Sequence, residues 1–540
     1  MAEIAKMDAF SFQPSGVGSQ PIRSRSNLVP VLSAIVVALG LSHLLQREVH
    51  ATTSDESTKR PNIVLLYTDD VGYGDVSCYG ATGVETPHVD RLAREGLRFT
   101  DAHCSAATCT PSRYALLTGS YAFRNKGARI LSGNAGAIIK PGTITLPSLL
   151  QQTGYATGVV GKWHLGLGDG AVDWNKAVKP GPNEIGFDYH FLIPATGDRV
   201  PCVYLEQGRV VDLDPADPIQ TSYGKPIGKG PTGKDRPDLL KQMWSHGHNA
   251  TIVNGISRIG FMTGGKKARW VDEDMADVIS HKAVSFIEAN KQKPFFLFFS
   301  THDIHVPRVP HSRFSGKSTM GLRGDAIVQM DWCVGQILKT LDRLKLTENT
   351  LVIFTSDNGP VLDDGYVDQA NEKLGEHQPA GDFRGGKYSL FEGGTRVPFI
   401  VRWPERVKPG TETKALFGQV DLAATLSKLA GAERPDAGLP DSHDELDALL
   451  GDDPVGRPHL VHEAPRSLAL RVGQWKFIPP GATREKLGPW NNVKIAKPGF
   501  LFELTTDPGE TRNVAIDHLD RTTEFAAMLA KLREQADHSP

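Results

Sequence analysis

Four short apolar runs constrain the fold of this chain more than any other feature of its sequence. They cover residues 61–67, 154–161, 295–300 and 350–355, and polar or turn-forming residues follow each of them. Runs that are short and continuously apolar are typical of strands buried on both faces of a parallel sheet. Segments with helical periodicity lie between them, so the sequence predicts an α/β fold with a mostly parallel central sheet flanked by helices.

The length of the chain calls for more than one domain. It has 540 residues, which is too long for a single small domain. The composition shifts beyond Pro404, and two strand-like segments flank Gly473 as a predicted hairpin. We therefore expect a large domain over residues 61–405 and a smaller α+β domain over residues 406–540.

The first 60 residues are typical of targeting rather than of a folded domain. Arg23 and Arg25 precede an uncharged stretch over residues 28–45, and a pattern of small residues ends at Ala51. This favours a signal peptide over residues 1–51, cleaved after Ala51, with an uncleaved N-terminal anchor as the alternative. A polar linker follows over residues 52–60. We expect an exported protein, periplasmic, extracellular or at the cell surface, which meets a membrane only through that segment if it is uncleaved.

Charge and cysteine usage exclude several classes of protein. The net charge of −2 provides no broad field that would attract nucleic acid, so any anion must be bound by locally placed lysines and arginines. The five cysteines have irregular spacings that form neither a zinc knuckle nor a disulfide framework. Export leaves four of them free to pair, and we assign the fifth to chemistry; the four are Cys78, Cys104, Cys202 and Cys333.

The fifth cysteine, Cys109, opens the run Cys-Thr-Pro-Ser-Arg. Thr110 can cap a helix and Pro111 suits its first position, so Cys109 is expected at a helix N-terminus. That end of a helix attracts anions, and Arg113 adds a full positive charge nearby. The alternative is an ordinary buried cysteine before a capped helix.

Carboxylates and an amide follow two of the predicted strands. Asp69 and Asp70 come after the first run, and Asp357 and Asn358 after the fourth. Open α/β sheets place their ligands at such strand ends, although Asp and Gly are also common in turns. An oxygen-only set favours Ca²⁺ or Mg²⁺ over zinc. Without a cation the carboxylates would repel one another, so either a metal or raised pKa values are required, and we predict a metal.

Basic side chains follow the same strand ends. Lys162 and His164 come after the second run and would share one face of an extended segment. His302 and His305 follow the third run, but their spacing on a loop is a weak signal for a metal pair. Together with Arg113 and Lys387, several of these groups could hold a tetrahedral oxyanion and transfer protons.

These motifs carry a family resemblance. The run from Cys109 to Arg113, together with residues 116–119, resembles the first signature of the sulfatases. Residues 154–164 resemble the second signature. Residues 357–359 and 501–513 are also similar to the type I sulfatases of arylsulfatase kind. The likeness extends over about residues 60–515, and on these motifs the sequence is identified as a member of that family.

The resemblance implies an alkaline-phosphatase-like fold and hydrolysis of sulfate esters, either aryl sulfates or sulfated carbohydrates, with release of inorganic sulfate. It also implies that a maturation enzyme oxidises Cys109 to formylglycine, whose hydrated form is the Ca²⁺-bound nucleophile. A hard, acidified oxygen suits attack on sulfur better than a thiol would.

The family's site residues transfer to matching positions of this chain. Ca²⁺ would be bound by Asp69, Asp70, Asp357, Asn358 and the modified Cys109. Arg113 would orient the nucleophile, while Lys162 and Lys387 would neutralise the sulfate oxygens. His164 would act as the base that releases sulfate, and His305 would protonate or stabilise the leaving oxygen.

Two other functions fit the same residues. One is a hydrolase of phosphate or phosphonate esters, since metal-bound nucleophiles and cationic pockets suit both anions. The other is an exported, non-catalytic protein that binds sulfated glycans, which would arise in a host without the maturation enzyme. The loop-rich residues 166–272 and 361–382 would determine the substrate, and their sequence has no period from which to derive a pocket.

Overall fold

The computed structural model describes residues 60–433, 438–465, 467–485, 487 and 491–537. The predicted signal peptide or anchor and the linker up to residue 59 lie outside the described residues. In the part of the chain that is described, no helix is long and apolar enough to cross a membrane.

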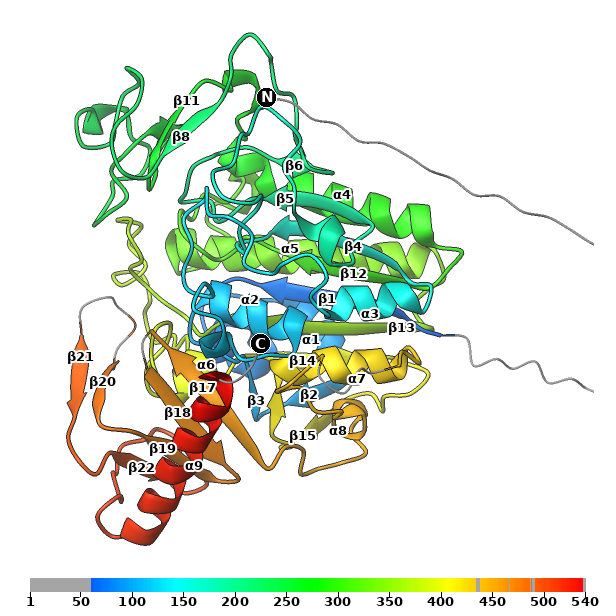
Figure 1. The fold of residues 1–540 in the computed structure, drawn as a ribbon, viewed down its shortest axis with the longest axis vertical. Coiled ribbons are helices and arrows are strands. Elements are labelled where there is room, and N and C mark those ends of the chain that lie inside the picture. The colour runs from blue at the N-terminus through cyan, green and yellow to red at the C-terminus, as the bar shows by residue number, and fades with distance from the viewer. Residues whose placement is uncertain (1–59, 434–437, 466, 486, 488–490, 538–540) are drawn as a thin grey trace, which may run out of the picture. The chain divides into compact units, whose positions relative to one another are not determined.

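A ten-stranded sheet forms the centre of the fold (Figure 1). Five adjacent strands in the middle of the sheet, β13, β1, β12, β4 and β5, are parallel to one another. On one side β14 is antiparallel to β13; on the other β6 is antiparallel to both β5 and β7. The strands in spatial order are β15 (Thr411–Thr413), β2 (Leu97–Phe99), β14 (Phe399–Arg402), β13 (Thr350–Ser356), β1 (Asn62–Thr68), β12 (Phe295–Ser300), β4 (Ala156–Lys162), β5 (Tyr189–Ile193), β6 (Leu205–Glu206) and β7 (Arg209–Val210). The predicted α/β architecture with a mostly parallel sheet is therefore confirmed.

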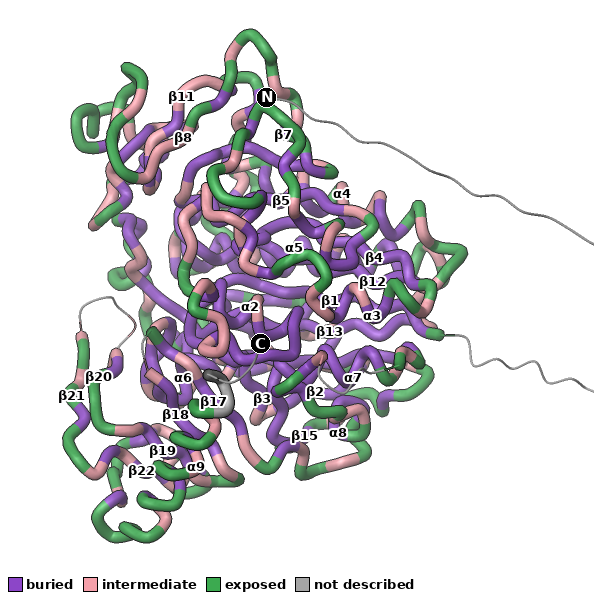
Figure 2. The backbone as a smooth tube through the Cα atoms, in the orientation of Figure 1, coloured by how far each residue is buried: buried purple, intermediate pink, exposed green. Residues whose placement is uncertain are grey.

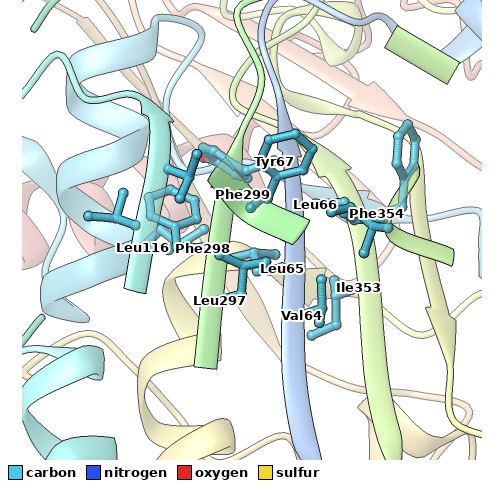
Figure 3. Packing of buried hydrophobic residues seen from close by; sticks show 14 of the residues in the cluster. Val64, Leu65, Leu66, Tyr67, Leu116, Leu297, Phe298, Phe299, Ile353 and Phe354 are labelled. Carbon is cyan, nitrogen blue, oxygen red and sulfur yellow. The ribbon is translucent and has the colours of Figure 1, made fainter. Parts of the chain in front are cut away.

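The four predicted strands are β1, β4, β12 and β13, and every residue in them is buried (Figure 2). Strands covered on both faces need no alternation of polar and apolar residues, which explains the largely apolar sequences of β1, β12 and β13; β4 also buries Thr157 and Lys162. Figure 3 shows part of the resulting core, in which Leu65 and Tyr67 of β1 belong to one cluster with Phe298 of β12 and Leu116 of a flanking helix.

Two layers of helices cover the sheet (Figure 1). One layer consists of α1 (Pro87–Arg94), α4 (Met275–Asn290) and α5 (Gly321–Arg343), and the other of α2 (Cys109–Thr118), α3 (Leu146–Gln152) and α7 (Leu422–Leu429). Within the first layer α5 contacts α1 and α4, and within the second α2, α3 and α7 contact one another.

A smaller antiparallel sheet follows toward the C-terminus. Its order is β17 (His459–Ala464), β18 (Ser467–Val472), β19 (Trp475–Ile478) and β22 (Phe500–Glu503), and α9 (Leu519–Asp537) contacts β18 and β19. The predicted hairpin about Gly473 joins β18 to β19. β15 lies beyond residue 405 yet pairs with β2, so the large sheet extends past the boundary predicted there. The division into domains remains a prediction.

Short elements complete the described chain. Four two-stranded sheets pair β3 (Ala102–His103) with β16 (Phe417–Gly418), β8 (Gln220–Ser222) with β11 (Phe261–Thr263), β9 (Ile252–Val253) with β10 (Ile256–Ser257), and β20 (Gly481–Arg484) with β21 (Asn492–Ile495). Two short helices are α6 (Glu392–Thr395) and α8 (Leu446–Leu450). The pairs β8–β11 and β9–β10 lie, like β5, β6 and β7, in the loop-rich region 166–272, where the sequence predicts small sheet insertions among loops.

A buried hydrogen-bonded network holds the turn that follows β1. Asp75 accepts two hydrogen bonds of 2.7 Å from Arg323 and one of 2.9 Å involving His377 Nε2. Burial raises the pKa of Asp75, but Arg323 and His377 outweigh it and lower the pKa to about 2. The carboxylate is therefore charged in the folded protein at any pH above that value.

We expect Asp75→Asn to lower the free energy of unfolding at pH 7 by about 3–5 kcal/mol, because it leaves a buried guanidinium without its anion. The folded pKa lies below the unfolded value, so Asp75 stabilises the fold above about pH 4 and loses that contribution, about 2.5 kcal/mol, as the pH falls toward 2. Urea unfolding at several pH values measures both effects. Asp238→Asn, in an exposed pair with Arg236, is the control and should cost less than about 1 kcal/mol; an equal loss would contradict the account.

Candidate active site at the carboxyl edge of the sheet

The carboxyl ends of the central strands bring the predicted acidic residues together. Thr68, the last residue of β1, is in register with Ser356, the last residue of β13. The backbone N–H of Asp70 donates to Asp357 Oδ1 at 3.2 Å, and Asn358 Nδ2 donates to Asp70 Oδ1 at 2.7 Å. Asp69, Asp70, Asp357 and Asn358 thus form one buried cluster, with each side chain less than 1% exposed.

Three buried cations pair with these carboxylates. Lys162 Nζ lies 2.5 Å from Asp69 Oδ2, and Lys387 Nζ lies 2.8 Å from Asp70 Oδ2. Arg113 donates twice to Asp357 Oδ2, from Nε at 2.9 Å and from Nη2 at 2.7 Å.

These ion pairs change what the repulsion among the carboxylates implies about a metal. The repulsion among the carboxylates was expected to require a metal or raised pKa values, but the chain supplies its own three positive charges. Burial still raises the pKa of Asp69 and of Asp70, and Lys162 and Lys387 oppose that effect. Charge repulsion alone is therefore no proof of a metal in this cluster.

Unpartnered oxygen atoms give a better test of whether a cation fits. Among the described residues, Asp69 Oδ1 and Asn358 Oδ1 are buried and accept no hydrogen bond. Buried polar atoms in native proteins nearly always have a partner, so each such atom needs an explanation. A hard cation held by these two oxygens and by Asp70 and Asp357 would satisfy both, and an oxygen-only donor set suits Ca²⁺ or Mg²⁺.

A second cluster that could be mistaken for a metal site lies between α6 and the small sheet. Its members are His103, Glu392 and His462. Glu392, which is fully buried, already accepts from Lys476 at 2.9 Å, Arg396 at 3.0 Å and Arg471 at 3.2 Å. Three positive charges on one carboxylate oppose a further cation, so this is an ion network that joins the small sheet to α6.

Cys109 lies at the N-terminus of α2, as predicted. The predicted cap is wrong, however, because the helix begins two residues earlier than the sequence indicated: Thr108 is the N-cap residue, and Pro111 is the third helical residue. The hydroxyl of Thr110 instead donates to the carbonyl oxygen of His164 at 2.8 Å. This bond ties the start of α2 to the segment after β4. All five cysteines lie in the described part of the chain, and none of them forms a disulfide there.

His164 faces the cysteine. Its Nδ1 lies 3.3 Å from Cys109 Sγ, while Nε2 lies 3.0 Å from the carbonyl oxygen of Leu131. A carbonyl can only accept, so Nε2 carries the proton and Nδ1 presents a lone pair to Cys109. Burial lowers the pKa of His164 well below its usual value, and Arg199 and Lys162 lower it further. The ring is therefore neutral at pH 7, and its Nδ1 can accept a proton.

Gly161 allows Lys162 to reach the acidic cluster. Its φ of +106° is left-handed, and a Cβ there would lie 1.9 Å from the carbonyl oxygen of Ser300. Only glycine fits such a close approach between β4 and β12. Arg113 also donates to the Lys162 carbonyl oxygen at 3.2 Å. The hydrogen bonds of Arg113 thus hold Asp357 and the end of β4 in place.

The two histidines after β12, His302 and His305, have different partners. His305 Nδ1 donates to the Val306 carbonyl at 2.7 Å, and its Nε2 lies 4.0 Å from Asp70 Oδ2. Burial lowers the pKa of His305 well below its usual value, with Lys387 and Lys162 adding to the effect. His302 Nε2 accepts the N–H of Gly197 at 2.9 Å, which makes His302 a wall of the site rather than half of a metal pair.

The sequence did not reveal several charged groups beside this cluster. Arg199 pairs with Asp198 at 2.7 Å, and His248 Nε2 lies 2.9 Å from the same carboxylate. All three come from the loop-rich region 166–272, where no motif or period marked them. Asp364 comes from the second loop-rich region, residues 361–382. It accepts a hydrogen bond from the hydroxyl of Tyr388, which lies just after that region.

The sequence model of the family described as Sulfatase matches residues 61–432. The chain is also 49% identical over 516 residues to an N-acetylgalactosamine-6-O-sulfatase of Bacteroides thetaiotaomicron, covering 95% of this chain and all of that protein. Human arylsulfatase A is 31% identical over 491 residues, covering 88% of this chain and 87% of its own length.

Solved structures agree with this relationship. A structure described with the metabolism of multiple glycosaminoglycans by Bacteroides thetaiotaomicron has 50% identity and a TM-score of 0.84, covering 88% of this chain and all of its own. A phosphonate monoester hydrolase of Agrobacterium radiobacter shares the fold at 18% identity and a TM-score of 0.54, covering 88% of this chain and 96% of its own. The predicted alkaline-phosphatase-like fold is confirmed.

Proposed function

Because the chain belongs to the sulfatase family and is a sulfuric ester hydrolase, we propose that its substrate is a sulfated carbohydrate, specifically the 6-O-sulfate of N-acetylgalactosamine. One observation supports the sugar above all others: 49% identity to an N-acetylgalactosamine-6-O-sulfatase over 95% of this chain and the whole of that relative. The relatives that are steryl-sulfatases and arylsulfatases are only 31–34% identical.

We further propose that a maturation enzyme converts Cys109 to formylglycine and that Asp69, Asp70, Asp357 and Asn358 hold Ca²⁺. The two unpartnered oxygens, Asp69 Oδ1 and Asn358 Oδ1, support a cation at this position. When both groups are present, they supply an oxygen nucleophile of lowered pKa and a positive charge beside the sulfate.

The lysines then bind the sulfate group. In the structure described here, Lys162 and Lys387 are each held by a carboxylate of the proposed metal set. A bound divalent cation would share those carboxylates, so the positive charge of the lysines becomes available to the sulfate oxygens. Buried cations aimed at developing negative charge stabilise a transition state more than they would in water.

The histidines handle the protons. His164, neutral and with Nδ1 directed at position 109, accepts the proton whose removal lets inorganic sulfate depart from the enzyme. His305 directs Nε2 into the same site, but its Nδ1–H is committed to Val306. It must therefore be protonated at Nε2 before it can donate to the leaving sugar oxygen, and a bound anion favours that charged form.

We retain export as part of the proposal. The support for export is the N-terminal sequence pattern alone.

The substrate is tested by measuring sulfate release from matched sugars. We expect kcat/KM on N-acetylgalactosamine 6-sulfate to exceed that on its C4 epimer, N-acetylglucosamine 6-sulfate, by at least about 10-fold, because a site that binds a sugar hydroxyl rejects a misplaced one. N-acetylgalactosamine 4-sulfate and a generic aryl sulfate should be slower still. Faster hydrolysis of the matched 6-phosphate would instead favour the phosphate ester hydrolase, and a preference for the aryl sulfate would contradict the sugar assignment.

A further inference from the structure

Asp364 lies beside the proposed sulfate site but has no part in the mechanism described above. Its Oδ2 accepts from Lys387 Nζ at 2.8 Å, and its Oδ1 accepts the Tyr388 hydroxyl at 2.9 Å. The same Lys387 nitrogen lies 2.8 Å from Asp70 Oδ2. One buried ammonium is thus shared by two carboxylates, of which only Asp70 belongs to the proposed metal set.

Tyr388 fixes the position of Asp364. The backbone φ of Tyr388 is +73°, in the left-handed region. This is rare for a residue with a bulky side chain and requires support from the surroundings. The backbone N–H of Tyr388 donates at 2.7 Å to the carbonyl oxygen of Ala107, two residues before Cys109. The Arg484 guanidinium lies 4.0 Å from the centre of the Tyr388 ring and holds it further. The backbone of Tyr388 is therefore anchored to the segment that carries Cys109, while its phenol is held by Asp364.

We propose that Asp364 is a positioning residue that fixes the ammonium of Lys387 against the sulfate group of the substrate. The reason is the division of Asp70 between two tasks: an oxygen that binds a divalent cation holds an ammonium less firmly. Asp364 is then the anion that keeps Lys387 in place. Tyr388 transmits the geometry of the Cys109 segment to Asp364, and Asp364 transmits it to Lys387.

The inference rests on the proposed function for its kinetic test. In the matured enzyme, Asp364→Asn should raise KM for the sulfated substrate about 10-fold while kcat changes by less than about 3-fold, because it weakens binding that the ground state and transition state share. The inhibition constant of inorganic sulfate should rise by a similar factor. Asp364→Glu, which restores the charge, should recover part of the loss, and Tyr388→Phe should raise KM less than Asp364→Asn does.

Asp363→Asn is the matched control. Asp363 is the neighbouring carboxylate, but it accepts from Ser245 and from the N–H of Gly365 and is a third exposed. Equal KM values for the two Asn variants would overturn the proposal. A fall in kcat with unchanged KM would do the same. If Asp364→Asn does not fold, KM is measured in Asp364→Glu and Tyr388→Phe instead. The proposal is overturned if both variants have the KM of the unaltered enzyme.

A binding measurement separates this inference from the proposed function. Inorganic sulfate is titrated by calorimetry into Cys109→Ala and into the double variant Cys109→Ala, Asp364→Asn. We expect about 10-fold weaker binding in the double variant, and this needs no turnover. If the matured enzyme hydrolyses no sulfate ester but this difference is found, the proposed function fails and the role of Asp364 stands. Equal affinities would refute the role of Asp364 whatever the activity.

Discussion

Cys109→Ala is expected to abolish sulfate ester hydrolysis and to leave the fold intact. The substitution removes the atom that the proposed maturation converts into the nucleophile, so kcat should fall by at least about 10⁴-fold, the scale seen when a covalent nucleophile is removed. The cysteine is 2% exposed, and its sulfur atom contacts His164 rather than holding an ion pair. The cost in free energy of unfolding should stay below about 2 kcal/mol. Sulfate release and urea unfolding measure the two quantities.

Cys104→Ala is the control for this prediction. Cys104 is another buried cysteine, five residues away, whose thiol donates to the carbonyl oxygens of Ala106 and Thr395. It should keep its activity within about 3-fold, since it touches none of the proposed catalytic groups. Mass spectrometry of the peptide that contains Cys109 provides a second test. An intact thiol in fully active protein would contradict the formylglycine mechanism, as would residual turnover by Cys109→Ala.

Asp69→Asn is expected to remove the metal dependence of the enzyme together with its activity. The change preserves shape but takes away a charge and one donor oxygen of the proposed Ca²⁺ site. We expect kcat/KM to fall by about 10³-fold or more, as for loss of a preorganised electrostatic contact. In the unaltered protein, Ca²⁺ at 100 times its dissociation constant should add about 2.7 kcal/mol to the free energy of unfolding. Asp69→Asn should abolish most of that gain.

Thermal unfolding with Ca²⁺ and with a chelator measures this effect without any turnover. The unaltered protein should lose activity in chelator and recover it in Ca²⁺. Asp173→Asn, in an exposed pair with Lys176, should respond to Ca²⁺ as the unaltered protein does. A protein that neither melts higher in Ca²⁺ nor loses activity in chelator would show that Lys162, Lys387 and Arg113 alone balance the three carboxylates.

The sequence predicted those parts of the fold that depend on local patterns. β1 and β13 were recognisable because strands buried on both faces are apolar throughout, and their ends predicted where Asp69 and Asp357 would meet. The start of α5 was not recognisable, because its first turns bury charged residues. Arg323 pairs with Asp75, which lies 248 residues away, so no local apolar period marks that turn.

The candidate site was predictable where motifs carried it and not where contacts between distant segments define it. The residues of both signatures, from Cys109 to His164, meet as expected. The pairing of each carboxylate with its own cation depends on strand order in three dimensions, which no spacing reveals. Asp198, Arg199 and Asp364 come from loops whose course is set by tertiary contacts, and so the sequence contained no signal for them.

The ion network on Glu392 has a consequence for protein engineering. The small sheet supplies Arg471 and Lys476 to this buried carboxylate, and Lys476 is fully buried with it. A chimaera that takes its C-terminal sheet from another protein must therefore carry both cations at matching positions. Otherwise it buries Glu392 with its compensation reduced, five residues along the chain from Lys387, the lysine proposed to bind the sulfate group. The C-terminal sheet is thus a fitted part of this catalyst rather than an interchangeable module.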